Sequence, residues 1–254
     1  MRGIGFNMVS SGSSGNCTLI WDQDTLLVID FGISLKRLKS RVKELGITNP
    51  EMSLFVSHEH SDHSSGIRVL MHNMPVDVYT RRSTAETLGL ADAFPIRDTV
   101  TIGNFVISAS SVSHDAVDPV AYTVQNGKAK ISIVSDLGYV TPGLVEIMKG
   151  SQVVALEANH DVDMLKSGSY PYPLKKRILG EQGHLSNAQT SEALEKVSTP
   201  ETRIILTHLS QENNTPDMAK QAVSMHLINR GIGYHSIECA SQDLGSSVYN
   251  IDVF

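Results

Sequence analysis

The chain has 254 residues, of which 41% are apolar and 19% charged, a composition that argues against disorder and supplies enough apolar material for one packed core. No apolar run is long enough for a membrane helix or a signal peptide, so we expect a cytoplasmic protein without a membrane partner, folded as a single domain over residues 1–254. The net charge of −6 argues against a protein that coats DNA, and two cysteines without a CxxC pair exclude a disulfide framework and a zinc ribbon.

The predicted elements alternate between strands and helices. Tight turns separate strands predicted at 5–9, 17–21 and 25–29, which indicates hairpins in an antiparallel or mixed sheet. Further strands are predicted at 53–56, 76–79, 100–110, 119–125, 130–135, 152–156, 203–207 and 247–253, and helices at 35–45, 64–73, 83–88, 141–149, 186–197 and 215–230. Because strands precede helices repeatedly in both halves, the sequence predicts an α/β chain with mixed sheets.

The stretch 159–185 is the least regular part of the sequence. It contains Tyr170-Pro171-Tyr172-Pro173, followed by the basic triplet Lys175, Lys176 and Arg177. A long connection of this kind is usually functional, so we expect an insertion that faces the substrate.

A cluster of metal-ligand residue types follows the predicted strand 53–56. The segment His58-Glu59-His60-Ser61-Asp62-His63 places three imidazoles and a carboxylate in a loop at the end of an apolar strand, where sites are commonly built. Imidazole and carboxylate groups are ligands for Zn²⁺, Mn²⁺ and Fe²⁺. The sequence therefore predicts a metal site here, the alternative being an exposed polar loop.

This HxHxDH pattern after a strand resembles the signature of the metallo-β-lactamase fold family. That family takes further ligands from the ends of later strands, and His114, Asp136 and His208 each follow an apolar run in the family's order. The segment Leu27-Val28-Ile29-Asp30-Phe31-Gly32 resembles the family's buried Asp-x-Gly turn, in which Asp30 would accept a hydrogen bond from a ligating histidine. The resemblance implies an αββα sandwich of two mixed β-sheets flanked by helices.

The same resemblance implies two divalent metal ions, Zn or Mn. The first ion would be held by His58, His60 and His114, and the second by Asp62, His63 and His208, with Asp136 bridging the pair. Because the bridging residue is Asp and not Cys, the pattern looks like the dinuclear hydrolases of the superfamily and unlike the members that cleave antibiotics.

Later segments resemble nucleases of this superfamily. Leu156-Glu157-Ala158 and Gly183-His184-Leu185-Ser186-Asn187 resemble the helper motifs of tRNA 3′-processing endonucleases, although Leu-Ser stands where those enzymes have Ser-Thr. A closer resemblance is to the bacterial YycJ/WalJ-like hydrolases, which share the segments at 10–16, 58–63, 112–115, 159–162, 176–180, 183–187 and 207–211. This group implies a 5′-to-3′ exonuclease that acts on DNA, with a link to DNA repair.

The resemblance and the residue chemistry together assign candidate roles. The catalytic side chains would be Asp62, His184 and Glu157, with His184 donating a proton to the departing oxygen and Glu157 holding its other ring nitrogen. The candidate substrate-binding residues are Lys175, Lys176, Arg177 and His160, of which the three basic residues would contact backbone phosphates. His160 either contacts the substrate or fixes the loop in which it lies. Tyr170 and Tyr172 either stack on a base or belong to a loop that the Tyr-Pro repeat stiffens.

Two other functions stay open on the sequence. A small-molecule hydrolase, such as a thioester hydrolase of the glyoxalase type, needs the same ligands and differs from a nuclease at His184, Glu157 and the basic triplet. The second is a metal-binding regulatory protein without turnover. The complete predicted ligand sets argue against it, because a purely structural zinc site is usually closed by four ligands. The expected substrate is DNA or RNA, and the residues leave open the metal, the polarity and the oligomeric state.

Overall fold

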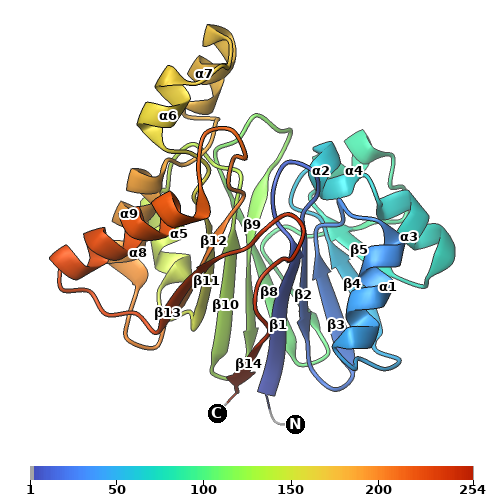
Figure 1. Ribbon diagram of the computed structural model, residues 1–254. Coiled ribbons are helices and arrows are strands. Elements are labelled where there is room, and N and C mark those ends of the chain that lie inside the picture. The colour runs from blue at the N-terminus through green and yellow to red at the C-terminus, as the bar shows by residue number, and fades with distance from the viewer. Residues whose placement is uncertain (1–2, 254) are drawn as a thin grey trace.

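Two β-sheets lie face to face with helices on both outer sides (Figure 1), which confirms the expected αββα sandwich. The computed structural model describes residues 3–253. Each sheet contains seven strands and combines parallel with antiparallel pairs.

The first sheet comes mainly from the N-terminal half of the chain, in the strand order β14-β1-β2-β3-β4-β5-β6. Its strands are β1 (Gly3–Ser10), β2 (Cys17–Trp21), β3 (Thr25–Ile29), β4 (Glu51–Phe55), β5 (Asp77–Thr80), β6 (Phe94–Pro95) and β14 (Tyr249–Asp252). Strands β3 to β6 pair in parallel, and the pairs from β14 to β3 are antiparallel. The connections after β3, β4 and β5 carry α1 (Leu35–Glu44), α2 (Ser61–Ser64), α3 (Ile67–Asn73) and α4 (Arg82–Leu88).

The second sheet has the order β13-β12-β11-β10-β9-β8-β7. Its strands are β7 (Thr99–Ile102), β8 (Phe105–Ser111), β9 (Val120–Asn126), β10 (Ala129–Val134), β11 (Val153–Glu157), β12 (Arg203–Thr207) and β13 (Ser236–Cys239). Strands β10 to β13 pair in parallel, which requires the crossover helices α5 (Pro142–Met148), α8 (Asn187–Val197) and α9 (Pro216–Asn229).

Three apolar clusters hold the four layers together. One cluster lies between the two sheets and includes Phe6, Phe55 and Tyr122. A second packs the other face of the second sheet against α5, α8 and α9, and a third packs the first sheet against α1, α3 and α4. Because both faces of the central strands are buried, these strands are nearly continuous apolar runs, as the sequence shows for residues 25–29 and 203–207. By contrast, β8 near the edge of the second sheet alternates between buried and more exposed residues.

Several predicted elements differ from the structure at local breaks in the chain. The strand predicted at 100–110 is the hairpin of β7 and β8, which turns at Gly103 with φ of 54°. The helix predicted at 64–73 is divided into α2 and α3 at Gly66, where a Cβ would lie 2.4 Å from the carbonyl oxygen of Ile33. Strands β6 and β13 were not predicted; both are short strands at the edge of a sheet.

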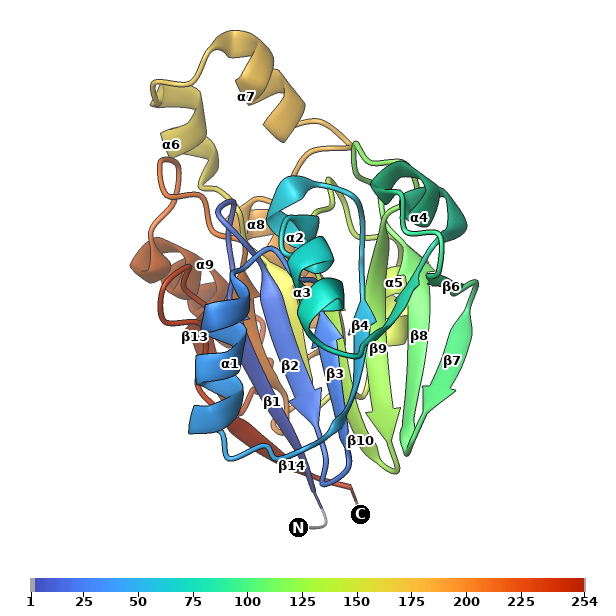
Figure 2. The same cartoon turned by 90° about the vertical axis from the view of Figure 1, so that its right-hand side faces the viewer.

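The segment predicted as irregular, 159–185, contains two short helices, α6 (Val162–Ser167) and α7 (Tyr172–Ile178). They project from the end of the sandwich opposite the two termini (Figures 1 and 2). Pro173 lies in the first turn of α7, where a missing backbone N–H is tolerated, so the second half of the Tyr-Pro repeat begins a helix, whereas Tyr170 and Pro171 lie in the connection before it. None of the helices in residues 3–253 is long and apolar enough to cross a membrane.

Candidate metal centre

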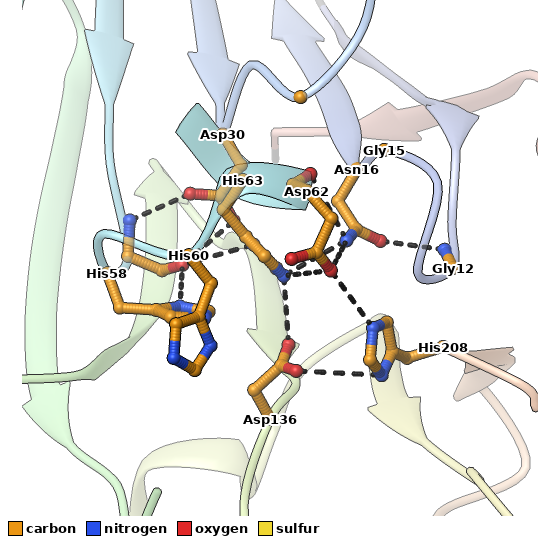
Figure 3. Close-up of polar contacts among 12 residues, drawn as sticks. Gly12, Gly15, Asn16, Asp30, His58, His60, Asp62, His63, Asp136 and His208 are labelled. Carbon is orange, nitrogen blue, oxygen red and sulfur yellow. Dashed lines mark hydrogen bonds and ion pairs between the residues drawn. The ribbon is translucent and has the colours of Figure 1, made fainter. Parts of the chain in front are cut away.

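The candidate site lies where parallel strands of both sheets end. Asp30 follows β3, His58 follows β4, Asp136 follows β10, Glu157 ends β11 and His208 follows β12. Parallel neighbours present their carboxyl ends at the same edge, so both sheets direct these side chains to one end of the sandwich. This is why residues that are widely separated in the sequence meet (Figure 3).

Backbone conformation at the site is unusual. Asp30, Asp136 and His208 have φ of 59°, 56° and 52°, in the left-handed region that non-glycine residues rarely adopt. In residues 3–253 only Asn49 shares this conformation among non-glycine residues. Each such residue costs of order 1–3 kcal/mol, a strain that is typical of functional positions.

Three histidines converge on one point. Nδ1 of His60 lies 3.1 Å from Nε2 of His58 and 3.3 Å from Nε2 of His114. Nitrogens bound to one tetrahedral zinc ion at about 2.0–2.1 Å are separated by about 3.3 Å. These nitrogens therefore have the spacing of ligands on one metal ion.

A second group adjoins the first. Oδ2 of Asp62 lies 3.4 Å from Nε2 of both His63 and His208. Between the groups, Oδ2 of Asp136 lies 3.2 Å from Nε2 of His63, and its Oδ1 lies 3.9 Å from Nε2 of His114. The Asp136 carboxylate thus faces both groups, and its buried Oδ2 accepts no hydrogen bond from the described residues, which leaves it free to bind a cation.

Hydrogen bonds on the outer side orient the imidazoles. His63 places Nδ1 2.8 Å from Oδ2 of Asp30, the contact expected from the sequence, and His208 places Nδ1 3.0 Å from Oε1 of Glu157. His114 points its Nδ1 at the carbonyl oxygen of Gly183, 3.3 Å away. If each Nδ1 donates its proton, each Nε2 keeps its lone pair directed inward, which is the arrangement that metal-ligating histidines use.

Nearby carboxylates favour positive charge at His63 and His208, although burial opposes it. Burial lowers the pKa of His63, but the Asp30 and Asp136 carboxylates outweigh it and raise that pKa well above its ordinary value. Burial likewise opposes the shift at His208, where Asp136, Asp62 and Glu157 raise the pKa to about 10. The second group, which attracts protons, also attracts divalent cations. In the first group burial lowers the pKa of His58 and of His114, which favours the neutral imidazoles that bind metal ions, so the donor set fits such ions.

A histidine–glutamate pair borders the second group. Nδ1 of His184 lies 2.7 Å from Oε1 of Glu157, as expected from the sequence. The same carboxylate also holds His208 and accepts hydrogen bonds from the backbone N–H groups of Leu137 and Leu185, both at 3.2 Å. Burial raises the pKa of Glu157, but His184 and His208 outweigh it and lower the pKa to about 2. Glu157 is therefore a buried anion that fixes two imidazoles.

The comparisons with known proteins identify the family. A model of the β-lactamase superfamily domain matches residues 27–209. The chain is 34% identical to exodeoxyribonuclease YycJ of Bacillus anthracis, over 91% of this chain and 92% of that protein. It is also 34% identical to exodeoxyribonuclease WalJ of Streptococcus pneumoniae, over 91% of both. This chain is a YycJ/WalJ-like protein of the metallo-β-lactamase superfamily.

A solved structure gives the same fold. The metallo-β-lactamase fold protein YhfI from Bacillus subtilis matches with a TM-score of 0.74, covering 98% of this chain and 99% of that one at 13% identity. Family membership and the His and Asp clusters together make this YycJ/WalJ-like chain a metal-dependent hydrolase.

The three residues of the basic triplet in this YycJ/WalJ-like protein differ in the contacts that their side chains make. Nζ of Lys175 donates to the carbonyl oxygens of Lys166 and Gly168 at 2.8 and 2.7 Å, which ties α7 to α6. Nε of Arg177 lies 2.5 Å from Oδ2 of Asp115. Lys176 is exposed, and among the described residues it has no hydrogen-bond or ion-pair partner. Lys176 is thus the member most available to a phosphate.

His160 lies inside the protein, with 1% of its surface exposed. Its two ring nitrogens find no hydrogen-bond partner among the described residues, and burial lowers its pKa to about 4. The loop is fixed instead through the backbone, since the carbonyl oxygen of His160 accepts from the N–H of Asn187 at 2.9 Å. In this geometry the ring neither fixes its loop nor reaches the surface, and a substrate contact for His160 stays a prediction.

Two site residues were not predicted from the sequence. Asn16 lies at the end of the Ser/Gly turn, and its Nδ2 is 3.1 Å from Oδ2 of Asp62 and 3.0 Å from Nε2 of His63. Asp115 lies between the site and α7, with Oδ1 3.3 Å from Nε2 of His114. Only the tertiary fold brings this Ser/Gly turn (residues 10–16) beside Asp62.

Proposed function

We propose that this chain is a dinuclear nuclease, which hydrolyses phosphodiester bonds of DNA in the 5′-to-3′ direction and takes part in DNA repair in the cytoplasm. The observation that carries the proposal is the pair of ligand groups that face one carboxylate, Asp136, beside the His184–Glu157 pair. The names of the two relatives, both exodeoxyribonucleases, support the choice of DNA.

The proposed ligands follow the two groups. One Zn or Mn ion would be held by His58, His60 and His114, and the other by Asp62, His63 and His208, with Asp136 between them. When bound, such a pair supplies positive charge to the phosphoryl oxygens and to an attacking water. The buried anions Asp30 and Glu157 hold His63 and His208 with their Nε2 atoms inward, and so keep the second group assembled.

His184 is proposed as the proton donor to the departing oxygen. Its Nδ1 is engaged with Glu157, which leaves Nε2 to face the substrate, and its side chain is 16% exposed. Burial lowers the pKa of His184, but the Glu157 carboxylate outweighs it and raises the pKa, so the ring carries a proton to give near neutral pH. Asp62 contributes as a ligand, and we place it in the catalytic machinery for that reason.

Lys176 supplies the proposed phosphate contact on the substrate side. It is exposed on α7, which projects at the same end of the molecule as α2, the helix that carries Asp62 and His63 (Figure 2). Arg177 acts less directly, because its guanidinium is already paired with Asp115. Lys175 holds α7 in place for both.

The test is degradation of 5′-labelled duplex DNA by purified protein, after chelation and after re-addition of Mn²⁺ or Zn²⁺. We expect metal-dependent release of nucleotides from the 5′ end. Labelled RNA and a panel of thioesters are assayed in parallel, since turnover of thioesters without degradation of either nucleic acid would replace the nuclease by a small-molecule hydrolase.

A further inference from the structure

A cleft of about 630 Å³ opens beside the candidate metal centre, on the side of His114 and His184. Its lining comes from three segments of the chain: Ser113 and Asp115, then Tyr139, and then Lys176, Arg177, Gly180, Glu181 and Gln182. The sequence analysis assigns phosphate contacts to Lys176 and Arg177, but it assigns no role to Tyr139. The volume is that of an ordinary small-ligand site and is large enough for a nucleotide.

The cleft adjoins the reacting centre directly. Asp115, which lines it, lies 3.3 Å from Nε2 of His114 through Oδ1. The lining residues Gly180 to Gln182 continue two residues later into His184, the proposed proton donor. Because His184 is proposed to give its proton to the departing oxygen, the part of the substrate that is bonded to this oxygen must lie on the side of His184 and the cleft.

The walls are fixed to each other before any ligand binds. Ser113 donates through Oγ to the carbonyl oxygen of Glu181 at 2.5 Å and accepts at its own carbonyl oxygen from the N–H of Gly138 at 2.9 Å. Gly138 fits tightly, since a Cβ there would lie 2.2 Å from the carbonyl oxygen of Glu181. Gln189 donates to the carbonyl oxygen of Gly138 at 3.2 Å. A cleft held in this way has a defined shape, which lowers the entropic cost of binding.

The chemistry of the lining suits a nucleoside with its phosphate. Tyr139 follows Gly138 and is 44% exposed, so its ring presents an aromatic surface that the core does not use. Among the charged residues that line the cleft, Arg177 and Asp115 neutralise each other as a pair, Glu181 adds an exposed carboxylate, and Lys176 is an exposed cation with no ion-pair partner among the described residues. An aromatic ring and an unpaired lysine that line the same cleft match a base and an adjacent phosphate.

We propose that this cleft binds the nucleoside on the leaving-group side of the scissile bond, with its base stacked on Tyr139 and an adjacent phosphate on Lys176. The inference rests on the proposed nuclease function and deepens it, since it assigns a place to the nucleotide that carries the departing oxygen. Tyr139 is then a substrate-binding residue, and turnover is expected to depend on an intact base at that position.

The experiment combines Tyr139→Ala and Tyr139→Phe with three duplexes, one intact, one abasic at the 5′-terminal residue and one abasic at the second residue. The measured quantity is the rate constant for release of the first nucleotide. We expect Tyr139→Ala to lose about 10-fold on intact DNA, the usual order of one stacked base, and Tyr139→Phe to keep most of the rate. Removing the base from the nucleotide that carries the departing oxygen should lower the wild-type rate constant by the same factor as Tyr139→Ala does. The same removal should not lower the rate constant of Tyr139→Ala further.

Phe94→Ala is the matched control, because Phe94 is a similarly exposed aromatic residue (48%) on β6, away from the cleft, and should leave the rate unchanged. The inference is overturned if Tyr139→Ala degrades intact DNA at the wild-type rate. It is also overturned if its defect is the same on all three duplexes. Failure of the proposed function has a different signature, since the wild type with metal would then leave every duplex intact.

Discussion

The side-chain amide of Asn16 donates a hydrogen bond to Oδ2 of Asp62 at 3.1 Å, and that oxygen is the one that faces the ring nitrogens of His63 and His208 (Figure 3). Oδ1 of Asn16 accepts from the N–H of Gly12 at 2.8 Å, so the amide is oriented with its nitrogen toward the site. The Ser/Gly turn therefore positions the candidate ligand Asp62 from outside.

Asn16→Ala should lower the affinity of the second metal site by about 10- to 100-fold, the usual effect of removing a side chain that orients a ligand. Metal titration of the apoprotein measures this affinity without any substrate. Asn7→Ala is the matched control, because Asn7 is another buried asparagine, and its amide bonds to the carbonyl oxygen of Ser246. Wild-type metal affinity in Asn16→Ala would show that the Asn16–Asp62 hydrogen bond does not matter for binding.

Local patterns of the sequence predicted the elements that carry the site. The apolar runs before His58, Asp136 and His208 are strands, and each places its following polar residue at the same end of the sandwich. The contacts of Asn16 and Asp115 could not be predicted in this way, because they depend on how the turn after β1 and the loop after β8 pack in three dimensions. The bond of Glu157 to His184 was predicted and is present, but its second bond, to His208, also depends on the three-dimensional packing and was not predicted.

Metal content tests the two ligand groups. Purified protein is expected to hold about two ions per chain by elemental analysis, and chelation should abolish activity until Mn²⁺ or Zn²⁺ is restored. Asp136→Ala should be the most damaging ligand change because this carboxylate faces both groups, whereas Asp62→Ala should mainly empty the second. Two ions and normal rates in both variants would rule out these assignments.

His184→Ala tests the proton donor. The variant should keep its metals and fold, and should slow turnover of DNA by about 10²–10⁴-fold, the usual contribution of a positioned general acid. The defect should shrink on a nitrophenyl phosphodiester, since nitrophenolate departs without a proton. Loss of metal in this variant would make His184 a ligand, and equal defects on both substrates would remove its role as donor.

The pH dependence of turnover tests Glu157. Its carboxylate raises the pKa of His184 against the opposing effect of burial, so Glu157→Gln should lower that pKa. The proton donor is then lost at lower pH, and the basic limb of the kcat/KM profile should move toward acid. Because Glu157 also holds His208, metal content and thermal stability are measured at each pH. If the basic limb stays in place in Glu157→Gln while the metals remain bound, the limb does not report the pKa of His184.

Single substitutions in the basic triplet should have unequal effects. Lys176→Ala should weaken DNA binding and reduce the slope of log K against log salt by about 0.9, the value for one lost phosphate contact on duplex DNA. Lys175→Ala should instead lower thermal stability, because Lys175 bonds to the backbone of α6 and the following turn and not to solvent.

Lys39→Ala on α1 is the surface control for these measurements, since Lys39 is an exposed lysine on the outer face of the first sheet's helical layer. It should leave both the salt slope and the melting temperature unchanged. The salt slope is measured by fluorescence anisotropy with labelled duplex in the absence of divalent metal, so that no cleavage occurs. An unchanged slope in Lys176→Ala would show that this residue makes no phosphate contact, and a reduced slope in Lys39→Ala would place the DNA on a different face of the molecule.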